Sequence, residues 1–141
     1  MRDPFMEALG LKVLHLAPGE AAVAGEVRAD HLNLHGTAHG GFLYALADSA
    51  FALASNTRGP AVALSCRMDY FRPLGAGARV EARAVEVNLS RRTATYRVED
   101  PHELVDARRE LVALFTGTVF RLGGDGDDVP AGTGNLAPRE A

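Results

Sequence analysis

The chain has 141 residues, of which 47% are hydrophobic and 23% charged, and it contains no tryptophan. One domain of this size can bury most of the apolar surface of its unfolded chain, so the composition excludes a disordered polymer and does not favour two full domains. With a net charge of −3 and no stripe of basic residues, the sequence does not favour nucleic acid as a partner.

Two features predict a cytoplasmic protein that makes no contact with a membrane. Cys66 is the only cysteine, so no intrachain disulfide is possible. The opening residues lack the apolar core of a signal peptide, and the most apolar stretch, Gly41 to Ala54, is too short to span a bilayer and contains Asp48.

The N-terminal third predicts a short helix followed by a β-hairpin. The helix is expected to start at Pro4 and end at Gly10, because proline suits a first helical turn and glycine a helix end. Two apolar runs, Leu11 to Ala17 and Ala21 to Ala29, are joined by a Pro-Gly turn and predict the hairpin. Asp30 to Gly41 is then a loop rich in histidine, asparagine and glycine.

The stretch from Phe42 to Leu53 predicts a helix that is buried on all sides. Its residues are mostly good helix formers, and the apolar ones fall on every face. A sheet of the same chain can cover only one of these faces. We therefore expect a second subunit to cover the remainder, which makes the protein a homodimer.

The residues after this helix predict four further strands. In the second of them the apolar phase slips by one residue between Ala84 and Val85, which predicts a β-bulge at that point. The others show alternating or continuous apolar patterns. The four strands are Val62 to Tyr70, Arg79 to Leu89, Ala94 to Glu99 and Leu111 to Leu122.

Two segments near the C-terminus are expected to lie outside the sheet. Asp100 to Arg109 is longer than a tight hairpin needs and is expected to form a helical turn at the surface. Residues 123–141 are rich in glycine, proline and acids and are expected to be disordered. Residues 1–122 then form one α+β domain, a curved antiparallel sheet wrapped around one long central helix.

Asp48 is the residue of the central helix that does not fit its apolar surroundings. A carboxylate there costs free energy unless it is paired, hydrogen-bonded or protonated, and no arginine or lysine lies one turn away. Such an acid either bonds a backbone N–H group or acts as a general base or nucleophile, because an apolar pocket moves its pKa toward neutrality. We favour the second interpretation.

The segment from Asn33 to Gly41 runs directly into this helix. Its glycines let a ligand approach the backbone, and the first turn of a helix offers unpaired N–H groups at the positive end of the helix dipole. We therefore expect the N–H group of Gly40 or Gly41 to serve as an oxyanion donor.

Two other clusters are weaker signals. His31, His35 and His39 have the spacing of metal ligands on a helix, but the glycines among them argue against a helix, so no metal site is expected. A hairpin turn also carries two guanidinium groups and two hydroxyls, which suits a phosphate group, although a solvated turn is the simpler interpretation. The residues of this turn are Ser90, Arg91, Arg92 and Thr93.

Taken together, the stretches HGTAHGG, FLYALADSAF, SCRMDYFRP and SRRTATYRVE resemble the hotdog-fold acyl-CoA thioesterases of the phenylacetate-pathway (PaaI-type) group. The similarity extends from Phe5 to Leu122. It implies a hotdog fold and a homodimer, often paired again into a homotetramer. It also implies hydrolysis of aryl- or acyl-CoA thioesters without a cofactor.

The resemblance further implies roles for individual residues. In that group the carboxylate matching Asp48 is a general base or nucleophile, and the amide matching Gly40 polarises the thioester carbonyl. The positions of Asn33 and His39 support the site. Gly41 and the turn from Ser90 to Thr93 are expected to lie near the CoA substrate.

Two other interpretations stay open. A hotdog dehydratase or hydratase would use a histidine and an acid, such as His39 and Asp48, to move protons at adjacent carbons. A non-catalytic acyl-CoA-binding module would not need Asp48 in its pocket. Ala52 lacks the hydroxyl with which some hotdog thioesterases hold water, so Ser49 is the candidate substitute.

Overall fold

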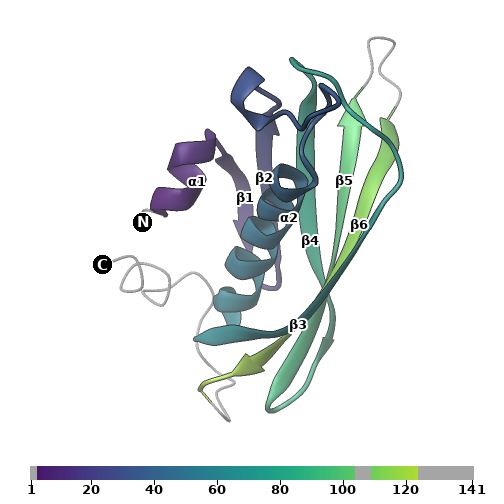
Figure 1. Cartoon of the computed structure of the whole chain (residues 1–141). Coiled ribbons are helices and arrows are strands. Elements are labelled where there is room, and N and C mark those ends of the chain that lie inside the picture. The colour runs from purple at the N-terminus through teal and green to yellow at the C-terminus, as the bar shows by residue number, and fades with distance from the viewer. Residues whose placement is uncertain (1–2, 104–108, 124–141) are drawn as a thin grey trace.

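One long helix lies against a six-stranded antiparallel sheet in the computed structural model, which describes residues 3–103 and 109–123 (Figure 1). The sheet order is β1-β2-β4-β5-β6-β3, so β1 and β3 are its edges. Two short 3-10 turns, Ala29–His31 and Asn56–Arg58, flank the long helix. The other elements are α1 (Pro4–Leu9), β1 (Lys12–Ala17), β2 (Glu20–Glu26), α2 (Gly40–Ser55), β3 (Ala61–Tyr70), β4 (Arg79–Leu89), β5 (Thr93–Glu103) and β6 (Arg109–Arg121).

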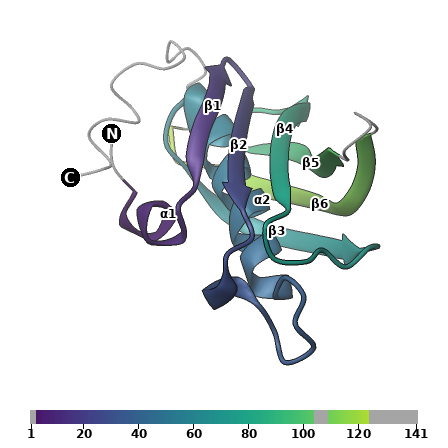
Figure 2. The same cartoon turned by 90° about the horizontal axis from the view of Figure 1, so that it is seen from above.

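The sheet curves around α2, as the view from above shows (Figure 2). β6 passes so close to the helix that a Cβ atom at Gly117 would lie 2.7 Å from the ring of Phe51. Glycine is therefore the residue that lets this strand and α2 meet. The largest side chains buried between helix and sheet are Leu46, Phe51, Tyr96, Val98 and Phe115.

The predicted helices are confirmed. α1 begins at Pro4, and Gly10 ends it in the left-handed region with a φ of 75°. α2 is longer than the predicted Phe42 to Leu53, because its first turn already begins at Gly40 under a cap from His39. Within the described ranges, no helix is both long and apolar enough to cross a membrane.

The position predicted for the β-bulge in β4 is wrong. The pairing with β5 runs without a break through Ala84 and Val85, and the irregularity lies between Glu86 and Asn88. Glu86 continues the inward-facing phase of Val80, Ala82 and Ala84, because its carboxylate is bonded inside the fold. A pattern that counts acidic residues as outward-facing therefore misplaces the slip.

The helical turn predicted for Asp100 to Arg109 is also wrong where the structure describes it. β5 and β6 continue to pair through this region, from Pro101 opposite Leu111 to Glu103 opposite Arg109. An irregularity between Glu99 and Pro101 absorbs the proline, which cannot donate to the ladder. Residues 104–108 and the predicted disordered tail beyond 123 lie outside the described residues.

Candidate active site

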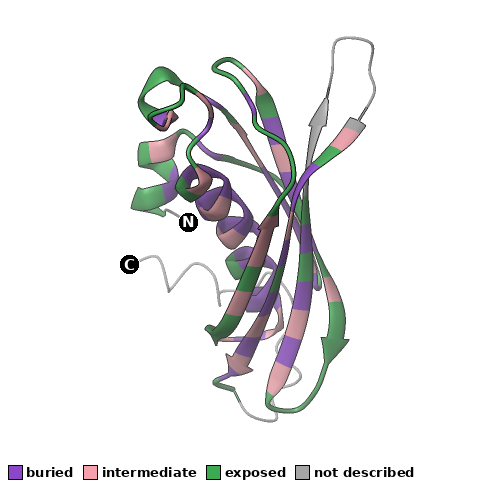
Figure 3. Cartoon of the chain, turned by 45° about the vertical axis from the view of Figure 1, so that its right-hand side comes forward, coloured by how far each residue is buried: buried purple, intermediate pink, exposed green. Residues whose placement is uncertain are grey.

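One face of α2 is left uncovered by the sheet. Eleven of the sixteen helix residues are buried. The partly or fully exposed ones include a stripe at intervals of three and four residues, and Figure 3 shows pink and green bands along the helix. This stripe, called the open face below, consists of Gly41, Tyr44, Asp48 and Ala52. The open face therefore carries the one acidic residue of the helix.

Asp48 is half-buried, and its environment favours the neutral acid. Burial raises the pKa of its carboxyl group, and the negative charge of Asp3 raises it further. No described residue donates a hydrogen bond to this carboxylate. Tyr44, one turn earlier, has its pKa raised to about 12 by burial, by a hydrogen bond with Cys66 and by nearby charge that includes Asp48. The Asp48 carboxylate is thus partly desolvated, but it lies on the face of α2 that the sheet of the same chain does not cover.

The first turn of α2 separates the two predicted oxyanion donors. The N–H group of Gly41 donates to Nδ1 of His39 at 2.8 Å, so that histidine caps the helix. The N–H group of Gly40 makes no hydrogen bond with any described residue. Gly40 is therefore the open donor, and Gly41 is occupied.

Tyr70 completes the start of the helix, a role that no sequence pattern indicated. Its hydroxyl donates to the carbonyl oxygen of Gly40 at 3.1 Å. Its ring lies 3.4 Å from the position that a Cβ atom on residue 40 would take. β3, on which Tyr70 lies, thus holds the first residue of α2 in place.

Asn33 shapes the loop before the helix. Its Oδ1 accepts from the N–H groups of His35 and Thr37 at 2.9 and 3.0 Å, and its Nδ2 donates to Oγ1 of Thr37 at 3.1 Å. The structure therefore gives Asn33 a supporting position in the loop, with no hydrogen bond to Asp48 among the described residues. Among the described residues no group of histidine, cysteine and acids is arranged to hold a metal ion.

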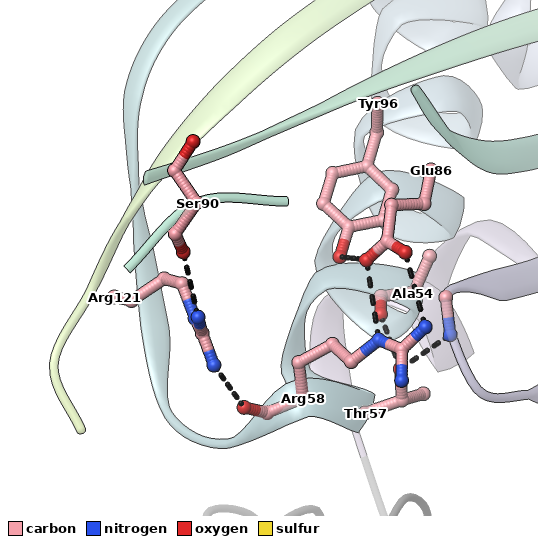
Figure 4. A network of polar contacts seen from close by, with 8 residues as sticks. Ala54, Thr57, Arg58, Glu86, Ser90, Tyr96 and Arg121 are labelled. Carbon is pink, nitrogen blue, oxygen red and sulfur yellow. Dashed lines mark hydrogen bonds and ion pairs between the residues drawn. The ribbon is translucent and has the colours of Figure 1, made fainter. Parts of the chain in front are cut away.

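The turn from Ser90 to Thr93 lies at the opposite end of α2. The N–H group of Ser90 donates to the carbonyl of Thr93 at 2.8 Å, and the side chains of Arg91 and Arg92 are exposed. Arg121, which sequence reasoning missed, donates from Nη1 to the carbonyl of Ser90 at 2.7 Å and from Nη2 to that of Arg58 at 3.3 Å (Figure 4). The turn is thereby tied to the residues that follow α2.

A second polar network fixes the same end of the helix. The guanidinium group of Arg58 donates to both carboxylate oxygens of Glu86, at 3.1 and 3.0 Å, and the hydroxyl of Tyr96 donates to Oε2 at 3.2 Å (Figure 4). Thr57 accepts from the N–H group of Gly19 and donates to the carbonyl of Ala54. The end of α2 is thus bonded to the β1–β2 turn and to β4.

The predicted residues do not converge within one chain. Gly40 and Asp48 are eight residues apart on one helix, about 12 Å along its axis at 1.5 Å per residue. The turn from Ser90 to Thr93 lies beyond the other end. Ser49 is no substitute for a water-holding hydroxyl, because its Oγ donates to the carbonyl of Ala45 at 2.7 Å and is buried. Tyr44, which shares the open face with Asp48, could have been found from the sequence, because it lies one helical turn before Asp48.

A curved antiparallel sheet wrapped around one long central helix is the hotdog fold. The thioesterase superfamily profile matches residues 35–99, a range that contains Gly40 and Asp48. The acyl-coenzyme A thioesterase PaaI of Escherichia coli K12 is 39% identical over 86% of this chain and 85% of its own length. The chain belongs to the thioesterase superfamily, in its PaaI-type group, and is a thioester hydrolase.

Solved structures agree with this assignment. The N33D variant of the phenylacetic acid degradation protein PaaI from Thermus thermophilus is 90% identical, with a TM-score of 0.81 over 85% of this chain and 100% of that one. A Streptococcus mutans protein bound to acetyl-CoA is 28% identical, with a TM-score of 0.73 over 78% of this chain and 86% of that one.

Proposed function

We propose that the chain hydrolyses aryl- or acyl-CoA thioesters, with phenylacetyl-CoA as the representative substrate, to the free acid and CoA. The observation that carries this proposal is the half-buried Asp48 carboxylate on the open face of a helix whose first N–H group, at Gly40, is unoccupied. The phenylacetic acid degradation protein and the acetyl-CoA complex among the similar structures support the substrate class.

Gly40 has the chemistry of an oxyanion donor. Its N–H group is at the positive end of α2, where the helix dipole and the free donor both favour negative charge. When the thioester carbonyl is attacked, its oxygen becomes an oxyanion, and a donor fixed in advance stabilises that charge. The leaving thiolate is a stable anion, so no strong general acid is needed.

Asp48 supplies the attack in one of two ways. As a general base it takes a proton from water, whose oxygen then adds to the carbonyl carbon and expels CoA as the thiolate. As a nucleophile it adds directly and forms a mixed anhydride, which water then hydrolyses. A raised pKa makes the ionised Asp48 a stronger base than an exposed aspartate in either case.

We propose that two chains build each site. One chain cannot bring Gly40 and Asp48 to the same carbonyl, and the open face of α2 needs a cover. β3 is an edge strand with exposed Val62 and Leu64, so it offers a surface on which two sheets can join. Two α2 helices packed antiparallel across a dimer axis place Gly40 of one subunit beside Asp48 of the other.

The decisive experiment follows thiol release from phenylacetyl-CoA with a thiol reagent. The wild-type chain is expected to release CoA, and Asp48→Asn to lower turnover at least a hundredfold, because the amide keeps the shape but is neither base nor nucleophile. The variant should unfold at no lower denaturant concentration, since it removes a charge from a desolvated position. Near-normal turnover would end the catalytic assignment. Substrate binding without thiol release would favour a binding module, and hydration chemistry without thiol release would favour a hydratase.

Complementation tests the shared site. Asp48→Asn and Gly40→Pro are each expected to be inactive, and mixed dimers refolded from both should regain activity at one intact site per heterodimer. Each variant refolded alone is the control. If heterodimers form and stay inactive, the site is not shared.

A further inference from the structure

We propose that Arg121 is a positioning residue for the coenzyme A half of the substrate. Its guanidinium group holds the turn from Ser90 to Thr93 against the end of α2, so that Arg91 and Arg92 are presented to phosphate groups. This inference rests on the proposed function, in which that turn binds CoA.

The contacts of Arg121 join the turn to the residue after α2. Nη1 donates to the carbonyl of Ser90 at 2.7 Å, and Nη2 donates to the carbonyl of Arg58 at 3.3 Å (Figure 4). Nη1 also donates to the carbonyl of Arg91 at 3.5 Å. The backbone N–H group of the same residue donates to the carbonyl of Arg92 at 2.7 Å. Three consecutive carbonyls of the turn therefore accept from one residue of β6.

Arginine is the side chain that suits this position. Arg121 is only 6% exposed although it carries a full charge, and its planar fork aims several donors in fixed directions at once. A lysine ammonium is a single point that cannot reach the carbonyls of both segments in the same geometry. The buried side chain is thus a rigid brace between the turn and the residue after α2.

A braced turn lowers the cost of binding. The side chains of Arg91 and Arg92 are exposed, so their backbone must be fixed before they can meet two phosphate groups together. Fixing it in advance removes the ordering entropy that a loose loop would lose on binding. The brace acts on the nucleotide end of the substrate and leaves the thioester end, at Asp48, untouched.

The experiment compares two thioesters that share the phenylacetyl group. One is phenylacetyl-CoA and the other is the N-acetylcysteamine thioester, which has no nucleotide. Arg121→Lys is expected to raise KM for phenylacetyl-CoA about tenfold, with kcat within about twofold and an unchanged kcat/KM for the short thioester. The matched control is Arg58→Lys, which disturbs the neighbouring pair with Glu86 while its own backbone carbonyl stays available to Arg121. It should leave the ratio of the two kcat/KM values as in the wild type.

Four outcomes would count against the proposal or against the proposed function on which it rests. Equal losses with both thioesters would show that Arg121 is merely structural, and an unchanged KM for phenylacetyl-CoA would also overturn the inference. A double variant, Arg91→Ala with Arg92→Ala, distinguishes failure of the Arg121 inference from failure of the proposed function. If this variant leaves KM for phenylacetyl-CoA unchanged, the turn does not bind CoA. If the wild type releases no thiol, hydrolysis is wrong, and calorimetric CoA binding by the same variants tests the brace instead.

Hydrogen exchange on the wild-type protein provides a second test, which does not depend on any variant folding correctly. The N–H group of Ser90 is expected to exchange slowly without ligand, with little added protection from CoA. Rapid exchange that slows only when CoA is added would mean that the turn is not braced beforehand, and would overturn the proposal.

Discussion

The two ends of α2 are built on opposite principles. At its start, a single histidine caps the helix through Gly41 and the N–H group of Gly40 is left open. At its end, Thr57 and Arg58 bond the residues that follow α2 to the β1–β2 turn and to β4, and Arg121 bonds them to β6. In the proposed function the first end receives the negative charge of the substrate's oxyanion, whereas the second end holds the fold together.

If the proposed function holds, this difference lets one helix serve both binding and stability. An open donor at a helix start costs little while water can reach it, and it becomes valuable when a ligand replaces that water. A partly buried carboxylate such as Glu86 has less freedom, because without its donors it would be a partly desolvated charge. Changes at the two ends should therefore affect different quantities.

The largest effect is expected at the start of the helix. Gly40→Pro removes the open N–H group and should lower kcat about a hundredfold or more, the scale of losing one oxyanion donor. His39 already has the extended backbone, with ψ of 138°, that a following proline requires, so the helix should still form.

The control for this variant is Gly40→Ala. Alanine adds the same Cβ atom, 3.4 Å from the ring of Tyr70, but keeps the N–H group. It should retain most of the activity in the same thiol-release assay. Equal losses in both variants would mean that the space at residue 40, and not its donor, is what matters.

A smaller effect, on stability and not on chemistry, is expected at the other end. Arg58→Met leaves the inward-facing Glu86 without its ion pair, and should lower the free energy of unfolding by about 2–3 kcal/mol. Arg83→Met is the matched control, because Arg83 lies 3.2 Å from Glu81 in a pair whose arginine is 50% exposed. Loss of such a surface pair should cost less than about 1 kcal/mol. Urea denaturation measures both, and similar losses would contradict the contrast.

The smallest effect is a shift in pH dependence. Activity that needs ionised Asp48 is lost on acidification at a higher pH than for an ordinary aspartate, because the pKa of Asp48 is raised. Asp3→Asn removes a negative charge that contributes to this rise, so the acidic limb of kcat/KM should move to lower pH. Asparagine still accepts from the N–H group of Met6 and keeps the cap of α1. Asp30→Asn is the control, and a limb that moves equally in both variants would contradict the assignment.

Local sequence patterns predicted most helices and strands of this chain. They did not predict features that depend on contacts between residues distant in the sequence. The presence of both helices, the start of α1, the hairpin and the unusual position of Asp48 follow from short stretches of sequence. The position of the β-bulge in β4 was predicted wrongly because Glu86 was taken to face outward. Its inward position depends on an ion pair with Arg58, which lies 28 residues away. The choice of Gly40 over Gly41 needed the geometry of the His39 ring, and the role of Arg121 needed the meeting of three segments.

The place of β6 in the sheet also determines when the fold can be completed during synthesis. β6 lies between β5 and β3, and β3 pairs with no other described strand. On the ribosome, β3 must therefore wait with both edges unpaired until residues 109–121 have emerged, so its backbone N–H and C=O groups have no strand to pair with during that time. Chaperone capture of this protein should accordingly concentrate on nascent chains that contain β3 but not yet β6.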